Sequence, residues 1–368
     1  MRYIHEQEDW PHFTWDETQL ATALAEIRNR QGRMVGRMES LGFKLRSDAI
    51  LDTLTVDVIK TSEIEGEKLP GDQVRSSVAR RLGMDIAGLV NSDRNVDGVV
   101  DMMIDASQKY QALLNKERLF SWHSSLFPSG RSGLKKIAVG AWRDGTSGPM
   151  QVVSGPIGRE RVHFQAPDAA KLNAEMSRFL RWFEDKSLVI DPVIRAAVAH
   201  LWFVTIHPFE DGNGRIARAI ADLALARSDK TAQRFYSMSA QIRVERNKYY
   251  DMLETTQKGG LDITPWLDWF LACLGRALDL SEKTLGSVLK KSRFWEQNSD
   301  ETFNPRQKKL LNKMLDGFDG KLTSSKWAVL AKCSQDTALR DIDDLLKRRI
   351  LTRDGTGGRS TAYLLASW

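Results

Sequence analysis

Residues 207–218 bring together side chains that suit phosphate chemistry. They read His-Pro-Phe-Glu-Asp-Gly-Asn-Gly-Arg-Ile-Ala-Arg. His207 can hold or release a proton near neutral pH, and Asp211 offers a hard oxygen ligand for Mg²⁺. Arg215 and Arg218 carry planar, forked cations that match phosphate oxygens. A base, a metal ligand and a phosphate cradle this close together indicate transfer of a phosphorus-containing group.

The segments on both sides of this stretch are expected to be helices. An apolar run, 196–206, precedes it, and the strong helix formers of 216–226 follow it. Gly212 and Gly214 would let the loop turn tightly and approach a ligand closely. The start of the second helix would offer free backbone N–H groups and the positive end of the helix dipole, which together make an anion site. The alternative is a polar helix–helix connection with a core histidine at its edge.

The pattern H-x-F-x-D-G-N-G-R-x-x-R resembles the signature of the Fic family, enzymes that move AMP from ATP onto a protein hydroxyl. Eight fixed positions match, and a chance match in a chain of this length is expected about once in 10⁸. The resemblance implies His207 as general base, Asp211 as the ligand of Mg²⁺, Arg215 as a guide for the outer phosphates, and Arg218 as the γ-phosphate ligand. It also implies that the loop binds the transferring α-phosphoryl group, through its backbone N–H groups and through Gly212, Asn213 and Gly214.

A second resemblance lies upstream of this motif. Residues 49–66 are expected to form a helix that ends near Gly66. Its last six residues, Thr-Ser-Glu-Ile-Glu-Gly, are similar to the Fic inhibitory motif, [Ser/Thr]-x-x-x-Glu-[Gly/Asn], which implies a pair between Glu65 and Arg218. Without the resemblance, an acidic helix end opposes the helix dipole, so three carboxylates would gain from cationic partners elsewhere: Glu63, Glu65 and Glu67.

A Gly- and Pro-rich segment, 128–167, contains two β-prone pieces that predict a hairpin over about 150–164. An isolated hairpin is unstable, so it must lie on the helical body. The resemblance makes this hairpin the Fic flap, on which a protein substrate docks by strand addition. Three histidines between residues 120 and 206 are expected to be structural: His123, His163 and His200.

The resemblance also places an aromatic and an amide side chain beside adenine, Tyr250 and Gln257. Fic proteins often have Asn where this chain has Gln257, so the base contact departs from the family pattern. The neighbouring Tyr249 is as well explained by core packing.

Composition describes an ordinary soluble protein, with 42% apolar and 28% charged residues, a net charge of +6 and 368 residues. No apolar run approaches the roughly 20 residues that span a bilayer, and the N-terminus lacks the hydrophobic region of a secretory signal. Cys273 and Cys333 make no metal pattern. A cytoplasmic location without membrane association is therefore expected.

The sequence predicts a mostly α fold: a Fic-type helical core with a β-hairpin flap, plus a C-terminal winged helix-turn-helix. The expected divisions are an N-terminal helical domain, a Fic core, a partly helical linker and the winged helix, at 1–95, 96–280, 281–303 and 304–368. From residue 301 onward, thirteen Lys and Arg face eight Asp and Glu. The third helix of this region is acidic, with Asp336, Asp341, Asp343 and Asp344, which would oppose DNA phosphates. DNA binding, protein interaction and dimerisation all remain open for it.

The predicted activity is protein adenylyl transfer from ATP with Mg²⁺, inhibited by Glu65. Three alternatives remain open. A Fic-fold kinase would depart from the Gly-Asn-Gly-Arg that this chain keeps. Removal of AMP from a modified protein would use Glu65 to direct a water. A DNA-binding regulator would use the Fic core as a sensor. Neither the target protein nor the oligomeric state, including a homodimer, can be deduced from the residues.

Overall fold

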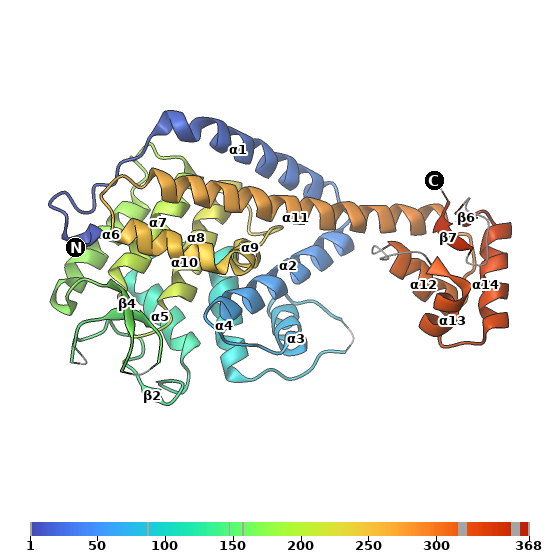
Figure 1. Ribbon diagram of the computed structural model, residues 1–368, viewed down its shortest axis with the longest axis horizontal. Coiled ribbons are helices and arrows are strands. Elements are labelled where there is room, and N and C mark those ends of the chain that lie inside the picture. Colours follow the sequence, from blue (N-terminus) through green and yellow to red (C-terminus); the bar gives the residue numbers. More distant parts are fainter. Residues whose placement is uncertain are drawn as a thin grey trace. The chain divides into compact units, whose positions relative to one another are not determined.

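The structure is a computed structural model that describes residues 2–86, 88–146, 148–156, 158–315, 322–354 and 361–366. The chain divides into two compact units, Met1–Ser281 and Glu282–Trp368. Helices dominate both units, and the strands form small antiparallel sheets, as the sequence predicts (Figure 1). Within the described residues, none of the helices combines the length and the apolar character needed to cross a bilayer.

The first unit is built from helices with two short hairpins. Its helices are η1 (Ile4–Glu6), α1 (Glu17–Glu39), α2 (Phe43–Ile64), α3 (Gly71–Arg81), α4 (Arg94–Gln108), α5 (Lys116–Leu126), η2 (Ala169–Lys171), α6 (Leu172–Glu184), α7 (Pro192–Ile206), α8 (Asn213–Asp229), α9 (Met238–Val244), α10 (Arg246–Gln257) and the first part of α11 (Thr264–Gln297). Its hairpins pair β1 (Arg131–Ser132) with β2 (Lys135–Lys136) and β3 (Gln151–Ser154) with β4 (Arg161–Gln165).

The pair α7 and α8 forms the centre of this unit. α7 begins at Pro192, a residue suited to the first helical position, and the preceding Asp191 caps it by accepting a hydrogen bond from the Val193 N–H. Nearly every residue of α7 is buried, as expected for a helix that is apolar on all sides. α8 packs along it (Figure 1). The sequence motif lies in the connection between them, so its loop stands on rigid supports.

The two N-terminal helices are long. α1 begins at Glu17, because the Asp16 carboxylate accepts a hydrogen bond from the Gln19 N–H, and it continues to Glu39. α2 begins at Phe43, earlier than the predicted residue 49. The expected domains 1–95 and 96–280 lie in one compact unit, since α2 packs against both α4 and α8.

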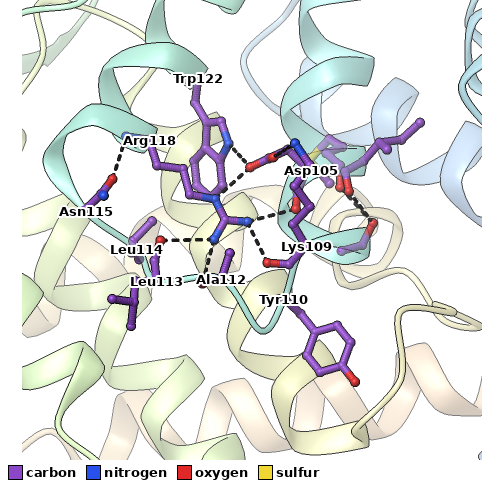
Figure 2. Close-up of polar contacts among 12 residues, drawn as sticks. Asp105, Lys109, Tyr110, Ala112, Leu113, Leu114, Asn115, Arg118 and Trp122 are labelled. Atoms are coloured by element: carbon purple, nitrogen blue, oxygen red, sulfur yellow. Dashed lines mark hydrogen bonds and ion pairs between the residues drawn. The ribbon is translucent and has the colours of Figure 1, made fainter.

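A network around Arg118 fixes the connection from α4 to α5 (Figure 2). The Arg118 Nε donates to the Asp105 carboxylate at 2.7 Å, and the Trp122 indole N–H donates to the same oxygen at 2.8 Å. The two terminal nitrogens of Arg118 donate to backbone carbonyls of the turn, those of Asp105, Lys109, Ala112 and Leu113. One guanidinium thereby satisfies several carbonyls at a helix end and sets the position of α5.

The second unit has the predicted order of three helices and a hairpin, with one additional short strand. After the last part of α11 come α12 (Pro305–Leu315), β5 (Leu322–Thr323), α13 (Ser324–Ala331), α14 (Gln335–Lys347), β6 (Leu351–Arg353) and β7 (Ala362–Leu365). β7 lies between β5 and β6 in an antiparallel sheet. The Gly-rich segment that connects β6 with β7, residues 355–360, lies outside the described residues. Most of the expected linker, residues 282–297, is helical, because no proline interrupts α11 there.

Two of the acidic residues that we weighed against DNA binding are engaged within this unit. Asp341 is buried and accepts hydrogen bonds from Nε and Nη2 of Arg306, at 2.8 and 3.0 Å, and from the Asn304 amide. Asp344 accepts a hydrogen bond from the Gln307 amide. Asp341 therefore stabilises the packing of α14 rather than presenting charge to a partner.

Candidate active site

His207 ends α7 in a left-handed conformation, with φ of 51° and ψ of 58°. Its Nδ1 lies 3.1 Å from the Val204 carbonyl oxygen. A carbonyl can only accept, so Nδ1 carries the proton and Nε2 keeps a free lone pair. Burial lowers the pKa of His207 to about 4. At neutral pH the side chain is therefore an uncharged imidazole with one nitrogen able to accept a proton.

The loop after His207 is held by its own motif residues. The Asn213 side chain accepts a hydrogen bond from the Phe209 N–H at 3.0 Å and donates to the Phe209 carbonyl at 2.8 Å. Gly212 has a φ of 81°, a conformation that favours glycine. Asn213 is 2% exposed. The side-chain amide of Asn213 therefore shapes the loop through Phe209, and the backbone N–H groups at the start of α8 remain for a ligand. The contact of Asn213 with phosphate stays a prediction.

Asp211 is oriented from two directions. One carboxylate oxygen accepts a hydrogen bond from the Gly212 N–H and the other from the Ser132 hydroxyl. The His123 Nδ1 accepts a hydrogen bond from the Gly140 N–H at 3.1 Å, so its Nε2 donates to the Asp211 carbonyl at 3.2 Å. His123 also stacks on Phe209 with ring centroids 4.1 Å apart. As expected, His123 is structural, and it supports the motif loop.

Among the described residues, His, Cys, Asp and Glu nowhere gather in groups of three or more that could bind a metal ion. This pattern is compatible with Mg²⁺, which usually binds through one or two carboxylates together with substrate phosphates and water. Asp211 has the oxygen donors for that role. A transition-metal site with a full set of protein ligands does not fit this loop.

Arg218 is 2% exposed and is held by the end of α2. Its Nη2 lies 2.7 Å from a Glu65 carboxylate oxygen. Its Nε donates to the Thr61 hydroxyl at 2.8 Å, and Nη2 also donates to the Thr61 carbonyl at 2.9 Å. The structure thus brings together Glu65 and Arg218, as the resemblance implied.

Gly214 lets the Glu65 carboxylate lie against the first turn of α8. A Cβ on Gly214 would fall 2.1 Å from a Glu65 oxygen, so glycine is required for this approach. α8 has no side-chain cap at its start, which leaves backbone N–H groups and the positive dipole end for an anion. Glu65 therefore occupies the anion-binding end of α8.

Arg215 also pairs with a carboxylate from the segment after α2. Its Nη1 donates to a Glu67 oxygen at 2.8 Å. Its guanidinium also lies over the Phe127 ring, 5.2 Å from the centroid. The sequence indicated that this acidic helix end needs cationic partners, but it did not identify Arg215 as the partner of Glu67.

A cavity of about 480 Å³ lies between His207 and α10. Its lining includes Glu65, His207 and Gly214, residues of both strands of the flap, and the face of α10 that carries Tyr249, Tyr250 and Gln257. The Tyr250 hydroxyl donates to Glu65 at 3.2 Å. Gln257 is 5% exposed and donates to the Thr205 hydroxyl at 3.2 Å. Both predicted adenine contacts thus lie at the same cavity as His207.

The flap is tied to α10 by Glu254, a residue that sequence reasoning missed. Glu254 binds the His163 ring and pairs with Arg161 at 3.0 Å and Lys258 at 2.6 Å. The other ring nitrogen of His163 lies 2.6 Å from the Ser154 hydroxyl, across the hairpin. The strands pair antiparallel with a bulge between Val152 and Val153. The predicted hairpin is present, and His163 is structural.

The second histidine of α7, His200, is buried and does not reach the cavity lining described above. Its Nε2 lies 2.9 Å from the Tyr249 hydroxyl. Burial lowers the pKa of His200 to about 3, so the ring is uncharged at neutral pH. On α10, burial also raises the pKa of the Tyr250 hydroxyl to about 12, so it keeps its proton. His200 is thus a buried core residue, as expected, whose Nε2 anchors α10 to α7, while its Nδ1 has no hydrogen-bond partner among the described residues.

Comparisons with known proteins agree with this arrangement. Residues 113–225 match the Fic/DOC family, and residues 3–84 match a domain of unknown function, DUF4172. Relatives named protein adenylyltransferase Fic are 37% identical in Culex quinquefasciatus and 36% in Drosophila melanogaster, each over 115 residues. These matches cover 31% of this chain and 21% and 22% of the relatives, so the chain spans about a fifth of the length of the curated relatives it matches.

Two solved structures share the fold. A Fic family protein from Desulfovibrio desulfuricans G20 superposes with a TM-score of 0.51 at 20% identity, covering 94% of this chain and 96% of that one. A Fic domain containing signaling protein from Bacteroides thetaiotaomicron also gives 0.51, at 19% identity, over 72% of this chain and 98% of that one.

Proposed function

Because residues 113–225 are a Fic domain, we propose that this protein transfers AMP from ATP to a hydroxyl side chain of a target protein. The observation that carries the proposal is the hydrogen bond from His207 Nδ1 to Val204, 3.1 Å long. It leaves Nε2 as a proton acceptor at a cavity that ends on the anion-binding start of α8. A base beside an anion site is what attack of a hydroxyl on a phosphate ester requires.

In the proposed reaction, the oxygen of the target hydroxyl attacks the α-phosphorus of ATP. The new oxygen–phosphorus bond replaces the bond to pyrophosphate, which leaves, and His207 Nε2 takes the hydroxyl proton. Free backbone N–H groups at the start of α8 would stabilise charge on the transferring phosphoryl group. Arg215 and Arg218 would bind the outer phosphates. Asp211 would hold Mg²⁺, which when bound supplies charge neutralisation for the phosphates.

The adenine end would lie against α10, with Tyr250 and Gln257. The target would dock on the flap through main-chain hydrogen bonds, because strand pairing depends mostly on backbone groups. Val153 of β3 is 48% exposed and Val162 of β4 is 38% exposed, so part of the hairpin is open to a partner. A docking mode of this kind accepts Ser, Thr or Tyr according to reach rather than through a dedicated pocket.

We further propose that the protein is autoinhibited by Glu65. Its carboxylate lies where a phosphate would bind, 2.7 Å from Arg218. While its guanidinium is paired in this way, Arg218 is unavailable to the γ-phosphate. ATP would then bind with its α-phosphorus out of line with the attacking hydroxyl. Misplacement by about 1 Å costs roughly 10² in rate. Release of α2 from α8 would then activate the enzyme.

Removal of AMP from a modified protein is a second candidate, because Glu65 and His207 line the same cavity. In that reaction a water replaces the hydroxyl as nucleophile, and Glu65 directs it. Incubation of the wild-type protein with an AMP-modified target would release AMP if this activity is present, and Glu65→Gly should abolish it.

The test of the main proposal is ATP labelled on either the α- or the γ-phosphate, incubated with the purified Glu65→Gly variant; the α-labelled sample is repeated with a cell extract as the source of target proteins. Label from the α-phosphate should enter protein, and label from the γ-phosphate should not. Incorporation of γ-label would instead indicate a kinase. If neither label enters protein, including the variant itself, adenylyl transfer is not the activity.

A further inference from the structure

The two motif arginines are each paired with a different carboxylate from one short segment. Arg215 and Arg218 are three residues apart on α8, so they lie on one face of the helix. Glu65 and Glu67 face them from the end of α2, at 2.7 Å from Arg218 and 2.8 Å from Arg215. The inhibitory resemblance accounts for only the first of these pairs.

The backbone of the segment explains how both carboxylates reach α8. Gly66 lies between them with a φ of 87°, in the left-handed region that favours glycine. The Gly66 N–H donates to the Glu63 carbonyl, and the Glu67 N–H donates back to the Ser62 carbonyl at 3.0 Å. This helix-ending turn reverses the chain after α2. As a result, side chains two positions apart point toward the same face of the motif helix.

We propose that Glu67 is a second inhibitory carboxylate, which withholds Arg215 from the outer phosphates of a nucleoside triphosphate while Glu65 withholds Arg218. The inference rests on the proposed function, since it assumes that this site binds ATP. It extends that function, because one segment then controls both phosphate-binding arginines. Release of the segment frees the two arginines together.

The two pairs differ in strength. Arg218 is 2% exposed and has two further bonds to Thr61. The Glu67 side chain is 39% exposed, and its partner Arg215 is 8% exposed. Solvent screening weakens a pair of this kind to the range of surface ion pairs. The ion pair between Glu67 and Arg215 is therefore the weaker of the two inhibitory contacts. Loss of Glu67 alone frees Arg215 while Arg218 stays paired.

The consequence is a graded response to substitution. Glu65→Gly leaves Arg215 engaged with Glu67, so this variant retains part of the inhibition. Glu67→Gln leaves Arg218 engaged with Glu65. The double variant Glu65→Gly/Glu67→Gln should bind the triphosphate more tightly than either single variant.

Titration calorimetry with Mg²⁺ tests this without requiring transfer. The ligands are AMP and an ATP analogue with a methylene group between the α- and β-phosphorus, which cannot release pyrophosphate. Glu67→Gln and Glu67→Ala should each bind the analogue roughly two- to five-fold more tightly than wild type, the range of an exposed ion pair. AMP affinity should not change, because AMP has no outer phosphates. Glu63→Gln is the matched control, because Glu63 lies in the last turn of α2, just before this segment, but pairs with Lys60 and Arg243.

The outcomes separate the two proposals. If Glu65→Gly binds the analogue but adding Glu67→Gln brings no gain, the role of Glu67 is overturned and the proposed function stands. An equal gain for AMP and the analogue also overturns it, since Arg215 would then not read the outer phosphates. If no variant binds either nucleotide, the proposed function fails, and the role of Glu67 fails with it.

Discussion

Replacing Glu65 with Gln should destabilise the free protein and make it more responsive to nucleotide. Glu65 neutralises Arg218, whose side chain is 2% exposed, while Glu65 itself is 32% exposed. Removing one partner of a fully buried pair costs about 3–5 kcal/mol, and an exposed pair contributes about 0–1 kcal/mol. Because Arg218 is buried and Glu65 is partly exposed to solvent, we expect the free energy of unfolding to fall by about 2 kcal/mol. For the first unit, Met1–Ser281, that corresponds to a fall in Tm of roughly 3–4 °C.

ATP should reverse this loss, because its phosphates supply the missing negative charge at Arg218. A ligand at 100 times its Kd stabilises the folded state by about 2.7 kcal/mol. In the wild-type protein the γ-phosphate must first displace Glu65, so the stabilisation at equal ATP is smaller. Gln preserves the shape of Glu and avoids placing a second glycine beside Gly66, which would loosen the helix end.

The assay is scanning calorimetry of wild type, Glu65→Gln and the Glu63→Gln control, each with and without Mg-ATP. We expect the lowest Tm for free Glu65→Gln and the largest upward shift with ATP for the same variant. Glu63→Gln should behave as wild type. An ATP-induced shift no larger in Glu65→Gln than in wild type would refute the competition between Glu65 and phosphate.

Three further outcomes follow from the contacts around the site. Since burial lowers the pKa of His207 to about 4, the imidazole is neutral and active above that pH. Transfer by Glu65→Gly should therefore be independent of pH between 6 and 8, and a midpoint near 6.5 would contradict the buried base. Glu254→Gln should speed hydrogen exchange in β3 and β4, because Glu254 ties the flap to α10; unchanged exchange would show that the flap is held by other contacts. Arg118→Ala should lower the free energy of unfolding in urea by roughly 1–3 kcal/mol, because it removes a charged hydrogen-bond partner of Asp105 and one donor from each of several carbonyls. Arg118→Lys should recover only part of that loss, since Lys lacks the fork, and full recovery would argue against the network.

The sequence anticipated much of the site because its signals are local. The motif fixes the residues of one loop and one helix start, and its glycines, base and arginines lie where that local pattern implies. The pair between Glu65 and Arg218 was also anticipated, through resemblance rather than through spacing. Its geometry depends on Gly214, whose missing side chain makes room for the carboxylate.

Contacts between segments distant in the chain could not be foreseen. No pattern connects Glu67 with Arg215, because the pairing depends on a reversal of the backbone at Gly66 and on the packing of α2 against α8. The two hydrogen bonds between the Asn213 amide and the Phe209 backbone depend on the tight turn of the loop, and the sequence did not indicate them. Glu254 gives no sequence signal, since its three partners come together only when the flap folds onto α10.

The second unit shows the same limit. The acidic residues of α14 suggested a helix that repels nucleic acid, but charge counts do not reveal which carboxylates are paired. Asp341 is buried beneath Arg306 and Asn304, while Asp336 and Asp343 remain exposed. The helical segment 282–297 was expected to be partly linker because its composition is polar and mixed in charge. Helix propensity along an uninterrupted stretch decided its structure instead.

The central claim is that His207 takes a proton from a hydroxyl that attacks the α-phosphorus of ATP. Its most direct test is the rate of labelling from α-phosphate-labelled ATP by Glu65→Gly and by Glu65→Gly/His207→Ala, with ATP affinity measured for both. We predict that the double variant loses about 10²–10⁴ in rate while its ATP affinity stays within a few-fold. Equal labelling rates for the two proteins would contradict the assignment of His207 as the base.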